Sequence, residues 1–271
     1  MPDTLDAELL ALAAEAARRA GRLLRDGRPS DLAVAATKSS PVDVVTEMDL
    51  AAEKMITEFL SARRPEDGIL GEEGGTTDGT SGVRWVIDPL DGTVNYLYDL
   101  PQWAVSIAAE VDGERAAAVV EIPMRAETFH ATRGGGAFVT QGDGPARPVR
   151  CRPSPPLEQA LIGTGFNYVA TVRTAQAALA QRLIPRLRDI RRTGSAAVDL
   201  CDVAAGRLDG FYERGLAPWD LAAGDLIVRE AGGRTGGRPG SEPDGDLTVA
   251  ASPGVFEVLQ PLLDDLGAWH D

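Results

Sequence analysis

Three separated clusters of acidic residues hold the side chains of this 271-residue chain that could do chemistry. Each cluster adjoins apolar residues, and the members are Glu72 and Glu73, then Asp88 and Asp91, then Asp220. Carboxylates without histidine or cysteine beside them are the ligands that hard divalent cations prefer, Mg²⁺ above all when a substrate phosphate completes the coordination. Two carboxylates about 4 Å apart repel each other by roughly 4 kcal/mol at an effective dielectric of about 20, and a divalent cation reverses that sign. The pattern therefore favours metal-assisted chemistry at a phosphate ester.

The second cluster follows the apolar run 85–87, in the sequence WVIDPLDGT. Pro89 fixes φ and has no N–H, so we expect the strand to end at Asp88 and the chain to bend there. The bend would turn Asp88 and Asp91 inward together. Gly92 and Thr93 would then open the next segment with free N–H groups, which suit phosphate oxygens.

Each cluster also has a purely structural interpretation. A Gly-rich acidic segment at 71–75 is typical of a solvated loop, and Asp-Pro and Asp-Gly are common turn formers. Asp220 near the start of a helix is typical of a cap. Three such signals in one chain favour a shared purpose.

Apolar periodicity predicts the elements that position these clusters. Residues 4–26 and 47–64 are expected to form helices, and Pro65 ends the second. Strands are expected at 84–87, 104–111, 116–122 and 128–131, with a hairpin turn at Asp112-Gly113. Beyond the Gly- and Pro-rich stretch 142–156, strands at 160–163, 189–192, 210–213 and 247–250 alternate with helices at 172–187, 196–205, 221–231 and 254–266. We therefore expect a layered α/β or α+β architecture in two lobes, 1–145 and 146–271, within a single compact unit.

Composition excludes several classes of protein. With 41 acidic against 27 basic side chains, the formal charge is −14, which argues against nucleic acid or an anionic membrane surface as the main partner. We see neither a signal peptide nor 18 uninterrupted apolar residues, so we expect a cytoplasmic protein without a membrane partner. A chain so acidic poses a puzzle if its ligand is a phosphate.

Histidine and cysteine are both scarce. His130 and His270 are the only histidines, which leaves little room for a zinc site or a Ser-His-Asp triad. Cys151 and Cys201 form no CxxC pattern. A single disulfide would be consistent with their number, but we expect two unpaired buried thiols.

The motifs together resemble the inositol monophosphatase family. The resemblance rests on Glu72-Glu73, on the run 85–93, and on Trp219-Asp220 followed by the sequence LAAG. It extends in order, at family-like spacing, from KSSPVD at 38–43 to EAGG at 230–233. Members of the family are Mg²⁺-dependent, lithium-inhibited phosphomonoesterases, in a superfamily with fructose-1,6-bisphosphatases and bisphosphate nucleotidases. The resemblance implies a five-layer αβαβα sandwich of the sugar-phosphatase type, usually a homodimer.

The resemblance also implies a metal site with two or three Mg²⁺ ions. The first ion would be bound by Glu72, Asp88 and the Leu90 carbonyl, and the second by Asp88, Asp91 and Asp220. Glu72 would share in a third, more weakly held ion. Glu73 would support the site rather than bind an ion.

Catalytic and substrate residues carry over in the same way. Thr93 would orient the attacking water together with Asp49, whose structural interpretation is the acid of a capping box after Thr46. The residues that would contact the substrate are the Gly92 and Thr93 amides for the phosphate, and Gly194, Ser195, Ala196, Glu213 and Asp220 for its hydroxyl groups. Lys38 would lie in a loop that closes over the site, or would be an ordinary surface lysine.

Several functions stay open at this point. A polyol or inositol monophosphatase is favoured over a histidinol-phosphate phosphatase of the same fold by Gly224 together with Tyr212-Glu213. Fructose 1,6-bisphosphate or a 3′-phosphoadenylate would need an additional cationic pocket, for which the candidates are Arg133, Arg173, Arg191 and Arg214. A non-enzymatic regulatory protein would have lost metal ligands, whereas every expected ligand is present.

Overall fold

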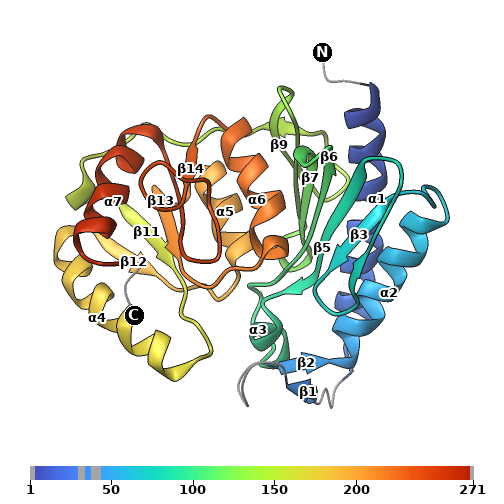
Figure 1. Ribbon diagram of the computed structural model, residues 1–271, viewed down its shortest axis with the longest axis horizontal. Coiled ribbons are helices and arrows are strands. Elements are labelled where there is room, and N and C mark those ends of the chain that lie inside the picture. The colour runs from blue at the N-terminus through green and yellow to red at the C-terminus, as the bar shows by residue number, and fades with distance from the viewer. Residues whose placement is uncertain (1–3, 30–33, 38–43, 269–271) are drawn as a thin grey trace.

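Two β-sheets and three layers of helices alternate in the computed structural model, which describes residues 4–29, 34–37 and 44–268 (Figure 1). Helices α1 (Thr4–Asp26) and α2 (Glu47–Ser61) cover the outer face of an eight-stranded sheet. Helices α5 (Ala196–Ala204) and α6 (Pro218–Glu230) lie between this sheet and a five-stranded one. Helices α4 (Ala170–Leu183) and α7 (Pro253–Asp265) cover the far side. The predicted αβαβα sandwich is confirmed.

The large sheet is mostly a meander. Its strand order is β10-β9-β8-β7-β6-β5-β3-β4, and the bounds are β3 Gly68–Gly71, β4 Gly75–Thr77, β5 Val83–Asp91, β6 Ala104–Val111, β7 Glu114–Ile122, β8 Glu127–Thr132, β9 Gly136–Gln141 and β10 Arg147–Pro148. Asp112 and Gly113 have φ of 52° and 84°, the backbone of a type I′ hairpin turn, so the predicted turn is confirmed. Strands β1 (Val34–Thr37) and β2 (Val44–Thr46) pair separately.

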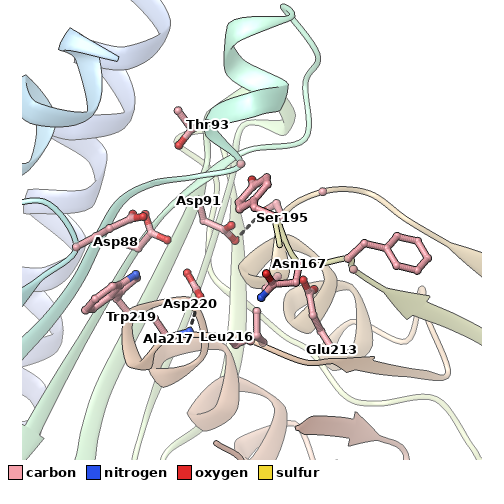
Figure 2. Close-up of a pocket in the computed structure, with 18 of the residues that line it drawn as sticks. Asp88, Asp91, Thr93, Asn167, Ser195, Glu213, Leu216, Ala217, Trp219 and Asp220 are labelled. Carbon is pink, nitrogen blue, oxygen red and sulfur yellow. Dashed lines mark hydrogen bonds between the residues drawn. The ribbon is translucent and has the colours of Figure 1, made fainter. Parts of the chain in front are cut away.

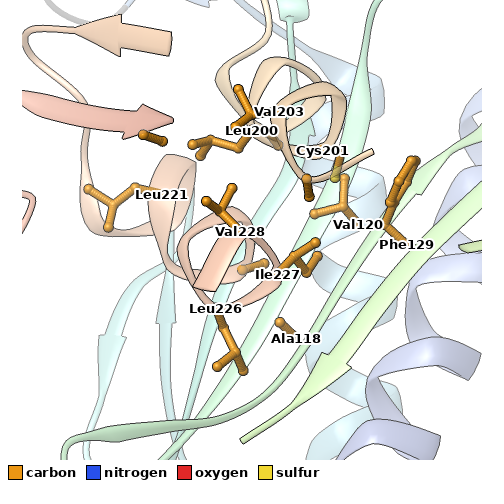
Figure 3. Close-up of a cluster of buried hydrophobic side chains, with 14 of the residues drawn as sticks. Ala118, Val120, Phe129, Leu200, Cys201, Val203, Leu221, Leu226, Ile227 and Val228 are labelled. Carbon is orange, nitrogen blue, oxygen red and sulfur yellow. The ribbon is translucent and has the colours of Figure 1, made fainter. Parts of the chain in front are cut away.

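Both faces of the large sheet are buried, because its strands alternate between two apolar cores. Trp85 and Ile87 point into the core beneath α1 and α2, whereas Val86 belongs to the core around α5 and α6. Figure 3 shows the second core, where Ala118 and Val120 of β7 face side chains of α5 and α6. This packing fixes the position of β5 between the two cores. It therefore also fixes the position of the acidic residues at the end of the strand.

The small sheet has the order β12-β11-β13-β15-β14. Its bounds are β11 Leu161–Thr164, β12 Asp189–Arg191, β13 Gly210–Glu213, β14 Arg234–Gly236 and β15 Thr248–Ala251. Strand β11 runs parallel to both β12 and β13, so the carboxyl ends of these three strands meet at one edge. That edge faces α3 (Thr93–Leu97) and the end of β5 (Figure 1).

The prediction that Pro89 ends the strand was wrong. Strand β5 continues to Asp91, and its pairing with β6 shifts between the pairs Asp88–Ser106 and Asp91–Ala104. The irregularity accommodates Pro89, because a residue at a bulge need not donate a ladder hydrogen bond. Carboxylate oxygens of Asp88 and Asp91 nevertheless lie within 4.8 Å of each other, as the expected inward turn requires.

Three further expectations concern the chain as a whole. Cys151 and Cys201 are both free, which confirms the prediction of unpaired thiols, although Cys151 is only half-buried. Strand β10 lies inside the stretch 142–156 and belongs to the large sheet, while the division into lobes 1–145 and 146–271 stays a prediction. None of the described helices is long and apolar enough to cross a membrane.

Candidate active site

A cavity of about 280 Å³ opens between the end of β5 and the converging strands of the small sheet (Figure 2). The predicted residues that line it are Glu72, Asp88, Leu90, Asp91, Gly92, Thr93, Gly194, Ser195, Ala196, Glu213 and Asp220. They come from five separate stretches of sequence. The sequence-based selection thus describes one place in the molecule, although the role of each residue stays a prediction.

The carboxylates meet because of strand pairing. Strands β3 and β5 are parallel, with Gly71 opposite Ile87, so Glu72 and Asp88 follow at adjacent positions. The Glu72 amide donates to the Ile87 carbonyl at 3.2 Å, which extends this pairing by one residue. Asp220 reaches the same place from the first turn of α6.

Asp88, Asp91 and Asp220 form the centre of the cavity. Each offers a carboxylate oxygen, and these oxygens all lie within 4.8 Å of one another. Figure 2 shows the three side chains pointing toward a common space. The Leu90 amide donates to Asp88 Oδ1 at 2.9 Å, which orients that carboxylate. An all-oxygen set this close fits a hard divalent cation.

The pKa values of the three acids are all raised, which also fits a cation site. Burial raises the pKa of Asp88 well above its ordinary value, and the charges of Glu72 and Asp91 raise it further. Burial raises the pKa of Asp91 to about 6, while the hydrogen bond from Ser195 opposes this rise. Burial and the charge of Asp91 raise the pKa of Asp220 to about 8. Without a cation, Asp220 therefore keeps its proton at neutral pH, whereas Asp91 has lost most of its proton there.

This arrangement predicts how pH acts on the metal-free protein. The unfolded chain releases its aspartate protons near pH 4, whereas folded Asp91 and Asp220 keep theirs until about pH 6 and pH 8. The stabilisation from these protons is complete below about pH 4 and is lost progressively as pH rises from there to those two values. We expect the melting temperature in a chelator to fall from about pH 4 to about pH 8.

Thermal melts in chelator and in excess Mg²⁺ check this expectation. A bound cation replaces the protons, so Mg²⁺ should abolish the fall. Asp220→Asn should remove the upper part of the fall in chelator. A melting temperature in chelator that rises over this pH range would contradict the charge assignment.

Two of the acids are held by helix N-termini. Asp91 Oδ2 accepts from Ser195 Oγ at 2.7 Å and from the Ala197 amide at 2.6 Å, both at the start of α5. Asp220 Oδ2 accepts from the Ala217 amide at 2.7 Å, so it caps α6 while it faces the cavity (Figure 2). The capping and site interpretations of Asp220 are therefore compatible. The sequence predicts that substrate hydroxyls meet Gly194, Ser195 and Ala196, and of these the Ser195 hydroxyl is already bonded to a carboxylate.

Thr93 connects the cavity to a buried carboxylate. Its hydroxyl lies 2.9 Å from Asp49 Oδ1 and 3.1 Å from the Leu90 carbonyl. Asp49 Oδ2 accepts from the amide and hydroxyl of Thr46, which is the capping box of α2. Burial raises the pKa of Asp49 above its ordinary value, and the hydrogen bonds from Thr46 oppose the rise. The capping box thus leaves one Asp49 oxygen for Thr93.

Glu213 stands on the opposite side of the cavity, at the end of β13. A Cβ on Gly165, the residue after β11, would lie 2.0 Å from Glu213 Oε1, so a larger residue there would displace this carboxylate. Burial raises the pKa of Glu213 well above its ordinary value, and the charge of Asp220 raises it further. Gly194 has a φ of +93°, a conformation that suits glycine at the turn before α5.

Among the described residues, the predicted Asp49 and Glu73 are not part of the cavity lining. The Glu73 amide donates to Glu53 Oε2 at 2.9 Å, and Glu73 faces a separate depression beside α2. Lys38 lies outside the described residues. Of the four candidate arginines, Arg214 lines the cavity, and Arg173 Nε donates to the Asn167 carbonyl at its edge.

The other two candidates, Arg133 and Arg191, pair with Asp6 and Asp189 and are not among the lining residues.

Sequence reasoning missed several residues of the site. Arg192, Phe166 and Tyr168 also line the cavity, and nothing local in the sequence distinguishes them. Glu53 is buried and accepts from the amides of Glu73 and Gly74, so it fixes the loop that carries Glu72. An acid one turn after Asp49, within the apolar stripe of α2, was the available signal.

The fold and the cavity together define a layered α/β protein of the sugar-phosphatase class, with a carboxylate cluster at the carboxyl ends of its strands. The sequence pattern of the inositol monophosphatase family matches residues 5–262. The chain belongs to the inositol monophosphatase family. This membership supports phosphatase activity.

Named relatives agree with that assignment. The inositol-1-monophosphatase of Mycobacterium leprae (strain TN) is 45% identical over 229 residues, which cover 82% of this chain and 78% of the relative. The protein named Nus factor SuhB of Escherichia coli (strain K12) is 44% identical over 227 residues, 83% of either chain. The solved structure of Mycobacterium tuberculosis SuhB superposes with a TM-score of 0.84 at 39% identity, covering 99% of this chain and 100% of that one.

Proposed function

We propose that this protein is a Mg²⁺-dependent phosphomonoesterase that hydrolyses inositol 1-phosphate or a related polyol or sugar monophosphate. The observation that carries the proposal is the set of oxygens from Asp88, Asp91 and Asp220 within 4.8 Å, in a cavity that also holds Glu72 and Thr93. Membership of the family, and the presence of Glu213 and residues 194–196 in the cavity lining, support the substrate class.

Two or three Mg²⁺ ions would occupy the carboxylate cluster. Glu72, Asp88 and the Leu90 carbonyl would hold the first, and Asp88, Asp91 and Asp220 the second. Divalent cations at such a site neutralise phosphate oxygens and make water a better nucleophile. The raised pKa values of Asp91 and Asp220 support this assignment, because a cation relieves the repulsion that causes part of the shift.

Thr93 and Asp49 would handle the proton of the attacking water. With the Thr93 hydroxyl donating to Asp49 Oδ1, its oxygen is left to accept a hydrogen bond from a water in the cavity. Because burial raises the pKa of Asp49, its carboxylate is a better proton acceptor than an exposed aspartate. Thr93 therefore orients the water, and the proton of the water can move toward Asp49 through the Thr93 hydroxyl.

The substrate would be held at both ends. The amides of Gly92 and Thr93 would bind the phosphate, at the left-handed turn where Gly92 has a φ of 100°. The hydroxyl groups would meet Glu213 and the backbone of 194–196, while Asp220 would contact both metal and substrate. Since the Ser195 hydroxyl is bonded to Asp91, we assign its backbone rather than its side chain to the substrate.

Glu213→Gln tests the substrate side. We expect KM for inositol 1-phosphate to rise about tenfold, because a hydrogen bond to a charged group contributes about 1.5–3 kcal/mol. The KM for p-nitrophenyl phosphate, which has no polyol, should change little. Steady-state kinetics with both substrates measures the difference, and equal changes would remove Glu213 from substrate recognition.

A substrate panel tests the function itself. Phosphate release is measured with and without Mg²⁺ from inositol 1-phosphate, histidinol phosphate, fructose 1,6-bisphosphate and 3′-phosphoadenosine 5′-phosphate. We expect Mg²⁺-dependent release, inhibited by lithium, with inositol 1-phosphate preferred. Preference for a bisphosphate would instead assign Arg192 and Arg214 to a second phosphate, since both line the cavity. No release from any member would contradict the proposal.

A regulatory role is the second candidate, because one relative is named a Nus factor. Since every expected ligand is present, we propose it only beside catalysis. The two are separable, because a binding role would survive Asp91→Asn and turnover would not. From the family resemblance we also propose a cytoplasmic homodimer, which light scattering of the purified protein can test. The expectation that nucleic acid is not the main partner stays a prediction.

A further inference from the structure

Asn95 is a buried carboxamide close to the cavity but not part of its lining. It lies in α3, two residues after Thr93, and its side chain is among the buried polar groups at 6% exposure. Its Nδ2 donates to the Gln102 carbonyl and, at 2.9 Å, to the Thr193 carbonyl. A single amide group thus joins the chain beyond α3 to the turn before α5.

The turn before α5 closely surrounds this carboxamide. Gly194 has a φ of +93°, and a Cβ there would lie 2.9 Å from Asn95 Nδ2 and 3.1 Å from its Oδ1. The backbone of Gly194 therefore passes directly over the Asn95 side chain. Both donor hydrogens of Asn95 have carbonyl acceptors, so aspartate, leucine or alanine at this position would leave those carbonyls unpaired.

The other end of the same turn holds a carboxylate of the cluster. Ser195 Oγ and the Ala197 amide donate to Asp91 Oδ2 at 2.7 Å and 2.6 Å. Ser195 also caps α5, with its Oγ accepting from the Val198 amide at 3.3 Å. Five residues of chain, 193–197, are therefore anchored by Asn95 at the start and hold Asp91 at the end.

We infer that Asn95 is a positioning residue that sets segment 193–197 against Asp91. It acts through the Thr193 carbonyl and touches neither substrate nor cation. Because Asp91 belongs to the β5 end and the segment belongs to α5, this connection aligns the two halves of the cavity. The inference rests on the proposed function only where a bound cation is measured. The contact between Ala197 and Asp91 can be followed without a cation, so this second measurement does not depend on the proposed function.

The test compares Asn95→Ala with the matched control Gln260→Ala. Gln260 Nε2 also donates to two backbone carbonyls, of Gly237 at 2.9 Å and Arg238 at 3.5 Å, but far along the chain from the cavity residues. We expect Asn95→Ala to weaken Mg²⁺ binding about tenfold by calorimetry, as loss of an outer partner of a metal ligand does. In the metal-free protein, hydrogen exchange of the Ala197 amide should become about tenfold faster or more. Gln260→Ala should change neither quantity.

Asn95→Asp is the second variant. It keeps the shape of the side chain, and its added negative charge alone would favour cation binding, so weaker Mg²⁺ binding here has no simple charge explanation. Mg²⁺ binding within about twofold of wild type together with unchanged Ala197 exchange in both variants would overturn the inference. So would failure of both to fold, because Asn95 would then support the fold rather than Asp91. A wild-type protein that binds no Mg²⁺ would count against the proposed function, while the exchange result would still decide the role of Asn95.

Discussion

Asp91→Asn is expected to abolish Mg²⁺-dependent phosphate release, with a loss of about 10³-fold or more, since a divalent cation contributes several kcal/mol to phosphoryl transfer. Asp91 uses one oxygen to accept from Ser195 and Ala197 and belongs to the cluster with Asp88 and Asp220. Asparagine has a single side-chain oxygen. If that oxygen keeps the bonds to α5, its NH₂ group faces the cation; if the amide is reversed, the bonds to α5 are lost.

The fold of Asp91→Asn should remain intact. Because burial raises the pKa of Asp91 to about 6, its charge at neutral pH opposes folding in the absence of a cation. The variant should therefore melt at the same or a higher temperature than wild type in chelator. Asp209→Asn is the matched control, a buried aspartate that accepts from the Leu161 amide and does not line the cavity. Near-wild-type turnover by Asp91→Asn would remove Asp91 from the metal site.

Thr93→Val is expected to lower kcat about 100-fold, within the range that a positioned proton-transfer group contributes. Valine has nearly the shape of threonine but no hydroxyl, so the hydrogen bond between Thr93 and Asp49 is lost while packing is kept. The KM should change little, because the proposed phosphate contacts of this residue come from its backbone. Stopped assays of phosphate release at saturating substrate measure the effect.

Thr93→Ser is the control for this prediction. Serine keeps the hydroxyl that lies 2.9 Å from Asp49, so most of the activity should return. Asp49→Asn should resemble Thr93→Val, although it also weakens the capping box with Thr46. A valine variant with the kcat of wild type would show that the attacking water is oriented by other groups.

The fold was predictable wherever periodicity was strong. The strand expected at 104–111 is β6 with the same bounds, and the helix at 4–26 is α1. Short strands without local pattern were missed, for example β14, which lies in a Gly-rich stretch and forms through pairing with β15. The helix expected at 172–187 ends at Leu183, because Pro185 follows and only a 3₁₀ turn continues.

The site was predictable where residue type alone carries the chemistry. An apolar run identified Asp88 and Asp91, the start of a helix identified Asp220, and the parallel pairing of β3 with β5 placed Glu72 beside them. Ser195 was predicted as a substrate contact, but the bond of its hydroxyl to Asp91 was not predicted, because it depends on how α5 docks against β5. Arg192 and Asn95 depend on the same tertiary arrangement. Such contacts join residues about a hundred positions apart, so no local pattern records them.

The acidic composition has a different meaning from the one it first suggests. A charge of −14 argues against an anionic ligand, yet the carboxylate cluster can bind one once cations are present. The proposed metal ligands account for only a few of the 41 acids. From the remaining excess we predict that nucleic acid is disfavoured as a partner.

The most direct test of the central claim is a crystal structure of the protein grown with Mn²⁺ in place of Mg²⁺, with the ions located by anomalous scattering. We predict anomalous peaks about 2.1 Å from carboxylate oxygens of Asp88, Asp91 and Asp220, with Glu72 at the same site. Peaks confined to other carboxylates, with this cluster free of metal at saturating Mn²⁺, would contradict a metal-dependent phosphatase centred on these residues.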